Sequence, residues 1–483
     1  MKQVRSSAIE ARTIEHIPLN ERHGKPRQMF VFWFGSSMTL GTMAAGFTST
    51  SLYGLPWWAA LPALLIGVLI GGIVLSLHAA QGPQTGIPQM LQTRAQFGSY
   101  GSLLVIIIVI FSFVGFTATN MVLGGQAIAS ITPISTPVGI IGIGVTATVA
   151  AAFGYTMIHR LAGVMSVAAG TTLLLAFIWM FGVVRLPSDT WVTGEFSFTG
   201  FLGTISLGTL WMISCAPFVS DYTRYLPKDT GVRVAFWATY AGSGLGAFLP
   251  MVLGAFLGSA VAGADVVAGL ASLTGNISIL VIVVFSIALV TQSAGLIYCA
   301  TLSTLTVGQT LFSRWAPGAT SRIVISVLTL AVSIVMALAG EAEFLTNFTN
   351  FILILLCVLI PWTAINLIDY YVIRHGEYDL VAIFERDGGQ YGRINGPAVI
   401  SYFIGIAVQI PLLATPMYTG PVAEAIGGVD LSWLVGLLLT SPVYVVLMRR
   451  YSRQNVTAAT DASAGVSGPA PASNHFSKST THG

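Results

Sequence analysis

The chain contains about twelve apolar stretches, each close to the roughly 20 residues that an α-helix needs to cross the hydrocarbon core of a bilayer. Only 8% of its residues are charged, whereas a soluble domain carries roughly a quarter. The sequence therefore predicts an all-α membrane protein with about twelve transmembrane helices. The stretches lie at about 29–52, 57–80, 101–129, 138–158, 161–184, 200–220, 234–261, 276–302, 323–340, 345–372, 396–415 and 431–448.

Lysine and arginine fall almost entirely on one side of this layout. Of 21 such residues, only Arg185 lies in a loop on the other side. Because loops that face the cytoplasm are enriched in Lys and Arg, we expect a multi-pass protein of the cell membrane with both termini in the cytoplasm. The segment before the first stretch has no small-residue cleavage site, so the first helix is expected to be retained.

Two apolar stretches are interrupted by residues that weaken a helix. The first contains the small residues Gly35–Thr39, and the sixth contains Ser214–Pro217, whose proline cannot donate a backbone hydrogen bond. Unwound segments at membrane depth are tolerated where they line a cavity, as in secondary transporters. The two stretches are five spans apart, as an inverted repeat of five helices requires. Close packing of helices through small residues is the alternative explanation.

The layout divides the chain into three parts. Residues 1–28 form a cytoplasmic N-terminal segment, 29–450 form one transmembrane transporter domain, and 451–483 form a tail rich in Ala, Ser, Thr, Gly and Pro. A tail of this composition has little to bury and is predicted to be disordered. The net charge of +3 and the seven histidines indicate neither a nucleic-acid surface nor a metal cluster. We expect the lipid bilayer as partner, and no obligate protein partner.

Almost no ionisable residue lies deep in a span, whereas amides such as Asn120 and Gln292 do. An amide offers both a donor and an acceptor to the edge of a neutral heterocycle, whose faces can stack on aromatic rings. Charged substrates would ask for a buried countercharge, and a membrane-embedded enzyme would need paired carboxylates or a nucleophile with its base. We therefore predict no enzyme and no cofactor. Hydrogen bonding between helices is the alternative role of both amides.

Four motifs follow one another along the chain. They are Gly-x-x-x-Gly-Ile-Pro…Arg…Phe-Gly-x-x-Gly at 82–101, Asn120 with Gly124-Gly125-Gln126, the run Pro217–Pro227, and Pro361-Trp362 with Asp369-Tyr370-Tyr371 and Arg374. Together and in this order they resemble the motifs of the purine-cytosine permeases of the nucleobase-cation symporter family, and the resemblance runs from about Arg27 to Arg450. It implies a five-plus-five inverted-repeat bundle of the leucine-transporter type with two additional C-terminal helices.

The resemblance further implies a symporter that imports a purine or cytosine-type nucleobase by alternating access. Its relatives carry several small heterocycles, so hydantoin or allantoin, a vitamin B6 vitamer and thiamine stay open as alternative substrates.

Site residues follow from the same resemblance, position by position. The substrate ring is expected between Phe116 on the third span and Trp211 on the sixth. Asn120 lies one helical turn after Phe116 and, like Gln292 on the eighth span, is expected at the edge of the substrate. Many relatives have Trp in place of Phe116, and bacterial relatives have Trp in place of Cys215. The predicted substrate-binding set is Ser36, Phe116, Asn120, Trp211, Ser214 and Gln292.

The coupling ion is either sodium or a proton. A sodium ion would take the hydroxyl of Thr291 and main-chain carbonyls near Ser36 and Met38. Relatives that use sodium carry a second hydroxyl where this chain has Gln292, and this incomplete hydroxyl set is the basis of the proton hypothesis.

Overall fold

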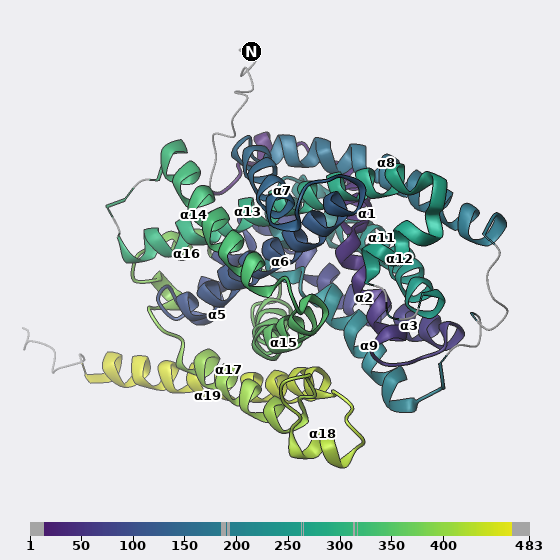
Figure 1. The fold of residues 1–483 in the computed structure, drawn as a ribbon. Coiled ribbons are helices and arrows are strands. Elements are labelled where there is room, and N and C mark those ends of the chain that lie inside the picture. The colour runs from purple at the N-terminus through teal and green to yellow at the C-terminus, as the bar shows by residue number, and fades with distance from the viewer. Residues whose placement is uncertain are drawn as a thin grey trace, which may run out of the picture.

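The chain is entirely helical apart from its connecting segments over the part that the structure describes (Figure 1). This computed structural model describes residues 14–184, 190, 194–261, 263, 265–312, 314, 315 and 317–465. Within these ranges the β-type pairing is limited to one isolated bridge between Ala414 and Thr419. The predicted all-α class is therefore confirmed.

The helices follow the predicted spans closely. In chain order they are α1 (Pro26–Ser37), α2 (Leu40–Ser51), α3 (Trp57–Ala79), α4 (Gly82–Thr85), α5 (Gln89–Phe97), α6 (Ser102–Ile131), α7 (Thr136–Ala152), α8 (Tyr155–Gly182), α9 (Phe198–Ile213), α10 (Val219–Thr223), α11 (Gly231–Ala260), α12 (Val266–Thr274), α13 (Ser278–Leu311), α14 (Ala319–Gly340), α15 (Phe344–Ile368), α16 (Leu380–Phe384), α17 (Gly396–Gln409), α18 (Pro421–Ala425) and α19 (Ser432–Gly465).

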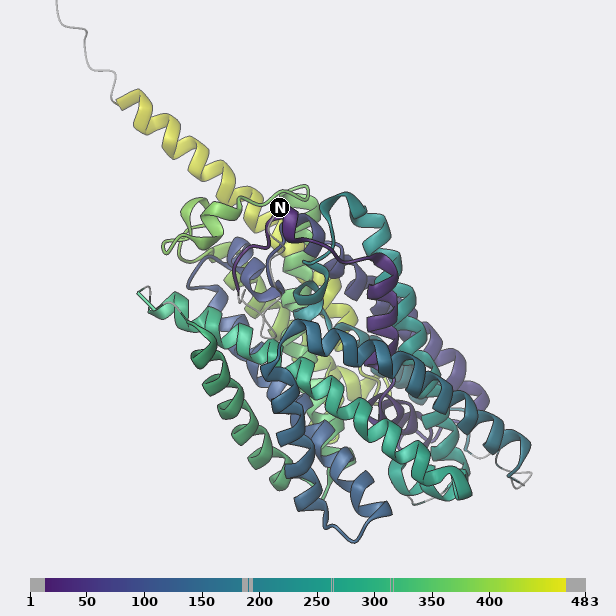
Figure 2. The same cartoon turned by 90° about the horizontal axis from the view of Figure 1, so that it is seen from above.

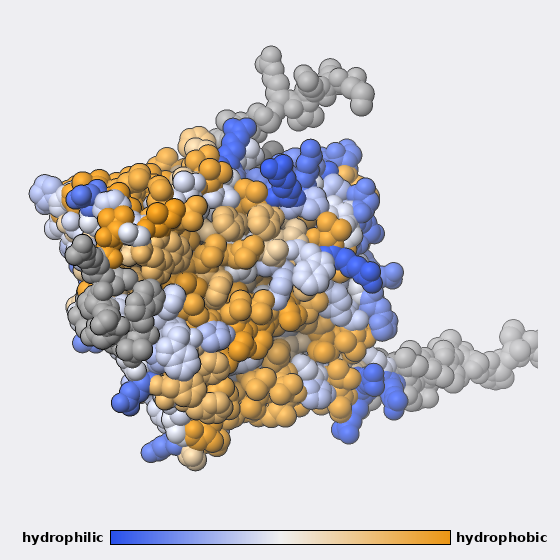
Figure 3. Space-filling model, turned by 90° about the vertical axis from the view of Figure 1, so that its right-hand side faces the viewer, coloured by the Kyte–Doolittle hydropathy of each residue, from blue (hydrophilic) through white to orange (hydrophobic). Residues whose placement is uncertain are grey.

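Nine helical segments within the described ranges are long and apolar enough to cross a membrane. Two more predicted spans correspond to the shorter apolar helices at 136–152 and 396–412, and the first predicted span corresponds to the pair α1 and α2. Figure 3 shows apolar side chains over most of the visible face, with hydrophilic side chains gathered towards its edges. On α14, Val327, Leu328 and Val335 are exposed, as expected of a helix that faces lipid. The exact number of crossings stays a prediction.

The two interrupted spans pack in a reciprocal way. Helices α1 and α2 lie along α11, and α9 lies along α3. Numbered as spans, the first contacts the seventh and the sixth contacts the second, which is the exchange that a five-helix repeat would produce. Glycines permit this close approach, because a Cβ at Gly46 would meet the carbonyl oxygen of Met251, and one at Gly254 would meet that of Met43. The inverted repeat stays a prediction that this pattern supports.

Helices α17 and α19 pack on each other and on α15, along one side of the bundle (Figures 1 and 2). Gln409 of α17 donates to the carbonyl oxygen of Cys357 in α15 at 2.8 Å. Asp369, which follows α15, accepts a hydrogen bond from Tyr444 of α19 at 2.7 Å. Helix α19 continues to Gly465, into the segment predicted to be disordered. Residues 466–483 lie outside the described part, and the disorder of the tail stays a prediction.

The N-terminal segment packs on the connection between α3 and α6. The backbone N of Ile17 donates to the carbonyl oxygen of Gly86 at 2.9 Å, and Arg22 Nη1 donates to that of Pro83 at 2.6 Å. This connection contains the short helices α4 and α5, and every residue of α5 is buried. The connection between α3 and α6 is therefore a packed helical segment. Residues 1–13 of the predicted N-terminal segment lie outside the described part.

Candidate substrate site

The first span breaks between α1 and α2. Met38 has φ −83° and ψ 74°, outside the helical region, and Thr39 caps α2 by accepting a hydrogen bond from the backbone N of Thr42. The hydroxyl of Thr42 donates to the carbonyl oxygen of Ser37 at 2.6 Å, across the break. Hydroxyl groups thus satisfy backbone groups that the break frees. The predicted interruption of the first helix is confirmed.

The sixth span breaks after Ile213, where α9 ends. Pro217 lies in a short 3-10 turn, Ala216–Phe218, and α10 begins directly after it. The hydroxyl of Ser214 donates to the carbonyl oxygen of Trp211 at 2.7 Å. The predicted break in this helix is confirmed, and Trp211 stands on the last turn before it.

A cavity adjoins both breaks, and α6, α8 and α13 complete its walls. None of the described residues that line it carries a charge. It is therefore a neutral, mainly aromatic site with a few hydroxyl and amide groups. Of the predicted residues, Ser36, Phe116, Trp211, Ser214, Thr291 and Gln292 line the cavity, whereas Asn120 and Met38 do not.

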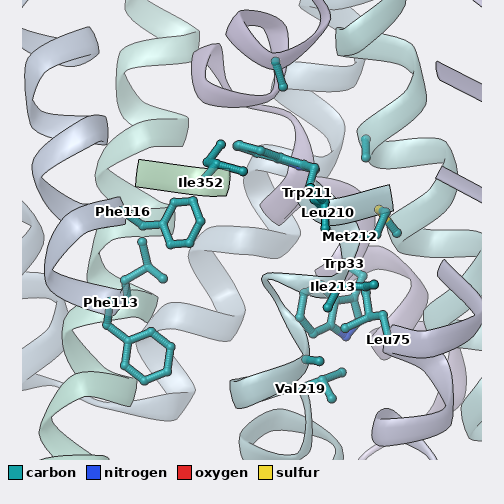
Figure 4. Packing of buried hydrophobic residues seen from close by; sticks show 14 of the residues in the cluster. Trp33, Leu75, Phe113, Phe116, Leu210, Trp211, Met212, Ile213, Val219 and Ile352 are labelled. Atoms are coloured by element: carbon teal, nitrogen blue, oxygen red, sulfur yellow. The ribbon is translucent and has the colours of Figure 1, made fainter. Parts of the chain in front are cut away.

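The two predicted stacking rings already touch each other. The ring centroids of Phe116 and Trp211 are 6.2 Å apart and the ring planes stand at 87°, a favourable edge-to-face geometry. Figure 4 shows the two side chains pointing towards each other from α6 and α9. A flat substrate held between them needs the rings to be roughly parallel. One ring must therefore turn before a sandwich can form.

The three predicted polar side chains on α6 and α13 have different surroundings. Gln292 Nε2 donates to the carbonyl oxygen of Ser36 at 3.2 Å, so that α13 is joined to the end of α1. The hydroxyl of Thr291 donates to the carbonyl oxygen of Ile287 at 2.9 Å. Asn120 is buried and its Nδ2 has no hydrogen-bond partner.

Asn120 and Trp211 meet beside Gly41. A Cβ on Gly41 would lie 3.5 Å from Asn120 Oδ1 and 3.5 Å from Trp211 Cη2. The amide of Asn120 is therefore next to the indole of Trp211 but outside the wall of the cavity.

Sequence reasoning missed Trp33 and three other aromatic residues that line the cavity, Phe32, Phe218 and Tyr222, and two aromatic residues beside it. Trp33 lines it, and its buried indole Nε1 has no hydrogen-bond acceptor. From α15, Phe351 lies 5.1 Å from Phe116, and Phe348 lies 6.2 Å from Trp211, between ring centroids. The signals were present: Trp33 lies one turn before the first break, and Phe348 and Phe351 are three residues apart on one helix face.

Phe32 lines both this cavity and a second one. Its ring stacks on His159 with centroids 5.4 Å apart and lies 4.3 Å from the ring of Tyr222. The second cavity is also lined by Lys25 and Arg27. Phe32 thus borders both the neutral cavity and a second cavity that has Lys25 and Arg27 in its lining.

Comparison with known proteins places these features in a family context. The model of a family described as permeases for cytosine/purines, uracil, thiamine and allantoin matches residues 16–436. A Bacillus subtilis protein, YxlA, to which a purine-cytosine permease function is ascribed, is 35% identical over 443 residues, covering 91% of this chain and 96% of that protein. A vitamin B6 transporter of Saccharomyces cerevisiae is 28% identical over 274 residues, covering 53% of this chain and 46% of that protein.

The fold also matches a solved structure. A nucleobase-cation-symport-1 family transporter, in a closed conformation with bromovinylhydantoin bound, superposes with a TM-score of 0.75 at 18% identity. The match covers 93% of this chain and 97% of that one. At this identity the likeness concerns the fold alone, and it agrees with the bundle that the sequence motifs imply.

Proposed function

The chain belongs to the family of permeases for cytosine/purines, uracil, thiamine and allantoin, and we propose that it imports a purine or cytosine-type base by ion-coupled symport. It is a multi-pass membrane transporter, not an enzyme. The observation that carries the proposed substrate class is the uncharged aromatic cavity beside the two helix breaks. Alternating access around this cavity is the proposed mechanism.

A nucleobase fits the chemistry of this cavity. It has two apolar faces and a neutral edge of donors and acceptors, which Phe116 with Trp211, and Gln292, can match respectively. The unpartnered indole N–H of Trp33 supplies a further donor for a ring nitrogen or carbonyl of the substrate. A charged substrate would lie in this cavity without a countercharge among the described lining residues, which is costly at membrane depth.

Asn120 enters the proposed site only after a movement of Trp211. Both residues adjoin Gly41, and the Asn120 Nδ2 group is buried without a partner. Such a group costs free energy until it finds an acceptor. We propose that Trp211 turns to stack on the substrate and that this turn opens Asn120 to the substrate edge.

We propose a proton rather than sodium as the coupling ion. A sodium site beside the first break would need oxygen atoms directed at the ion, but the Ser36 carbonyl oxygen accepts an N–H from Gln292. The amide hydrogens of Gln292 and a cation would compete for the same oxygen. Uptake should persist when sodium is replaced by choline and should collapse with a protonophore. Uptake that demands sodium and ignores a protonophore, under a maintained sodium gradient, would refute this proposal.

We further propose a cell-membrane location with both termini in the cytoplasm and one transporter domain over residues 29–450. The support is the distribution of Lys and Arg, all but Arg185 on one predicted side. The packing of Ile17 and Arg22 on the connection after α3 keeps the N-terminal segment on that side. Reporter fusions at each terminus that are active only outside the cytoplasm should stay silent; an active fusion would reverse the orientation.

A second substrate class is favoured by one feature of the cavity. Cys215 lines it with a small side chain, so space is left for ring substituents. Hydantoin or allantoin, a vitamin B6 vitamer and thiamine are therefore the alternative substrates, in keeping with the family description and with the vitamin B6 transporter among the relatives.

The deciding experiment measures uptake of radiolabelled cytosine and hypoxanthine in cells that lack other carriers. Unlabelled bases, hydantoins and vitamers then serve as competitors. Accumulation of a base above its external concentration, blocked by unlabelled base alone, supports the proposal. If the cells take up a vitamer or a hydantoin but no base, the protein is a transporter of the second substrate class. Uptake that never exceeds equilibrium would indicate a passive channel.

A further inference from the structure

A polar cavity lies apart from the substrate site, where α5, α13 and the segment after α16 meet. It is lined by Arg94, Ser99, Gln309, Thr310 and Arg386, together with two aromatic side chains. No acidic side chain is among the described residues of its lining. The polar groups that face this space are therefore mainly donors, two of them positively charged.

Arg94 is the buried charge of this cavity, with 6% of its surface exposed. Its Nη1 donates to the carbonyl oxygen of Ile383 at 3.2 Å and its Nη2 to the hydroxyl of Thr310 at 2.5 Å, while its Nε has no partner. All the acceptors are neutral. Burial lowers the pKa of Arg94 to about 10, so the guanidinium still carries its charge at neutral pH. A buried cation without a countercharge is costly.

Arg386 places a second positive charge at the mouth of the cavity. Its side chain is exposed, and its carbonyl oxygen is fixed by the hydroxyl of Ser99 at 3.0 Å. The acidic neighbours point elsewhere: Asp387 Oδ1 accepts from the backbone N of Gly389 at 3.2 Å, and the Glu385 carboxylate lies beside Gly389. The positive charges of the cavity are therefore not neutralised by the carboxylates that flank Arg386 in sequence.

We propose that this cavity binds a small phosphate-type oxyanion, either inorganic phosphate or the phosphate group of a soluble metabolite. Such an anion has several acceptor oxygens and suits guanidinium groups, which bind it through charge-assisted hydrogen bonds. Arg94 supplies the buried charge, Arg386 the charge at the entrance, and Gln309 a further donor. The site is separate from the substrate cavity and shares no lining residue with it.

The test uses the purified full-length protein without transport substrate and inorganic phosphate as the probe. Thermal unfolding is followed against phosphate concentration, with chloride at equal ionic strength as reference, and radiolabelled phosphate is measured by equilibrium dialysis. We expect saturable stabilisation and saturable binding by phosphate. An equal response to phosphate and chloride would overturn the proposal.

Two matched variants locate the binding. Arg386→Gln removes the exposed charge at the mouth and is expected to weaken phosphate binding about tenfold or more. Arg393→Gln removes an exposed charge from the same connection but outside the cavity, and should bind phosphate as the wild type does. Equal weakening of phosphate binding by both variants would show that general surface charge, and not this cavity, holds the phosphate, and would overturn the proposal. Phospholipid that co-purifies, is lost in Arg386→Gln and is not displaced by phosphate would also overturn the proposal of a soluble anion.

Discussion

Replacing Trp211 by alanine should weaken substrate binding. Trp211 is the only large ring that the last turn of α9 contributes to the cavity, next to the break at Ser214. Removing it takes away one face of the proposed stack. The substrate ring and the ring of Phe116 would then lie beside open space, where the wild-type protein has the indole.

The expected loss of binding free energy is the difference between the energies of two contacts of Trp211. Stacking of a base on an aromatic side chain contributes about 1–3 kcal/mol. In the unliganded protein, Trp211 already contacts Phe116 edge to face, which is worth about 0.5–1.5 kcal/mol and is given up on stacking. The net loss in Trp211→Ala is therefore about 0.5–1.5 kcal/mol, or roughly a 2- to 13-fold increase in Kd.

The assay is binding of radiolabelled base to the purified protein, with uptake in cells as a second readout. Trp237→Ala is the matched control, because Trp237 lies on α11 with 61% of its surface exposed and is absent from the cavity. Trp211→Phe keeps a ring and should lose less affinity than Trp211→Ala. Wild-type affinity in Trp211→Ala, with unchanged thermal stability, would refute the stacking role of this residue.

Three further outcomes follow from individual contacts. Trp33→Phe keeps an aromatic ring and removes an N–H that has no acceptor in this structure. Base binding should weaken by about 0.5–1.5 kcal/mol, and unchanged binding would exclude Trp33 as a donor. Gly254→Ala places a Cβ against the carbonyl oxygen of Met43 and should cost about 1–3 kcal/mol of stability, measured as a lower Tm. Gly142→Ala is the control, because a Cβ at Gly142 would meet nothing within 4 Å, and it should leave the Tm unchanged. Gln292→Ser frees the Ser36 carbonyl oxygen and supplies a hydroxyl, so uptake should acquire a response to sodium; uptake indifferent to sodium in this variant would contradict the competition proposed between the amide and the ion.

The breaks in the first and sixth spans could be predicted because their causes are local. Pro217 and the small residues from Gly35 to Thr39 weaken a helix whatever surrounds them. The ring geometry could not be predicted, because the orientation of Phe116 depends on Phe351, which a distant helix brings against it. Side-chain contacts of this kind are set by packing between helices and leave no trace in a local pattern.

The position of Asn120 illustrates a limit of the helical spacing rule. Residues four apart share a helix face, so Asn120 was expected beside Phe116 in the cavity. Four residues also advance about 6 Å along the axis, and the cavity ends within that distance: Phe116 lines it and Asn120 does not. The face was predictable from sequence, but the depth of the cavity along that face was not.

The contact between Phe116 and Trp211 links substrate binding to a conformational change. A substrate can enter between these rings only if they separate, and Trp211 stands beside the break between α9 and α10, while Phe116 lies on the continuous helix α6. The backbone at the break between α9 and α10 moves more easily than the backbone of α6, because it lacks a regular series of helical hydrogen bonds. In the proposed mechanism, turning Trp211 acts on the α9–α10 junction and exposes Asn120, which adjoins the same glycine, Gly41. A ligand that gains stacking only in the turned state shifts the population towards that state. We therefore propose that the edge-to-face pair opens when a flat ring enters the cavity.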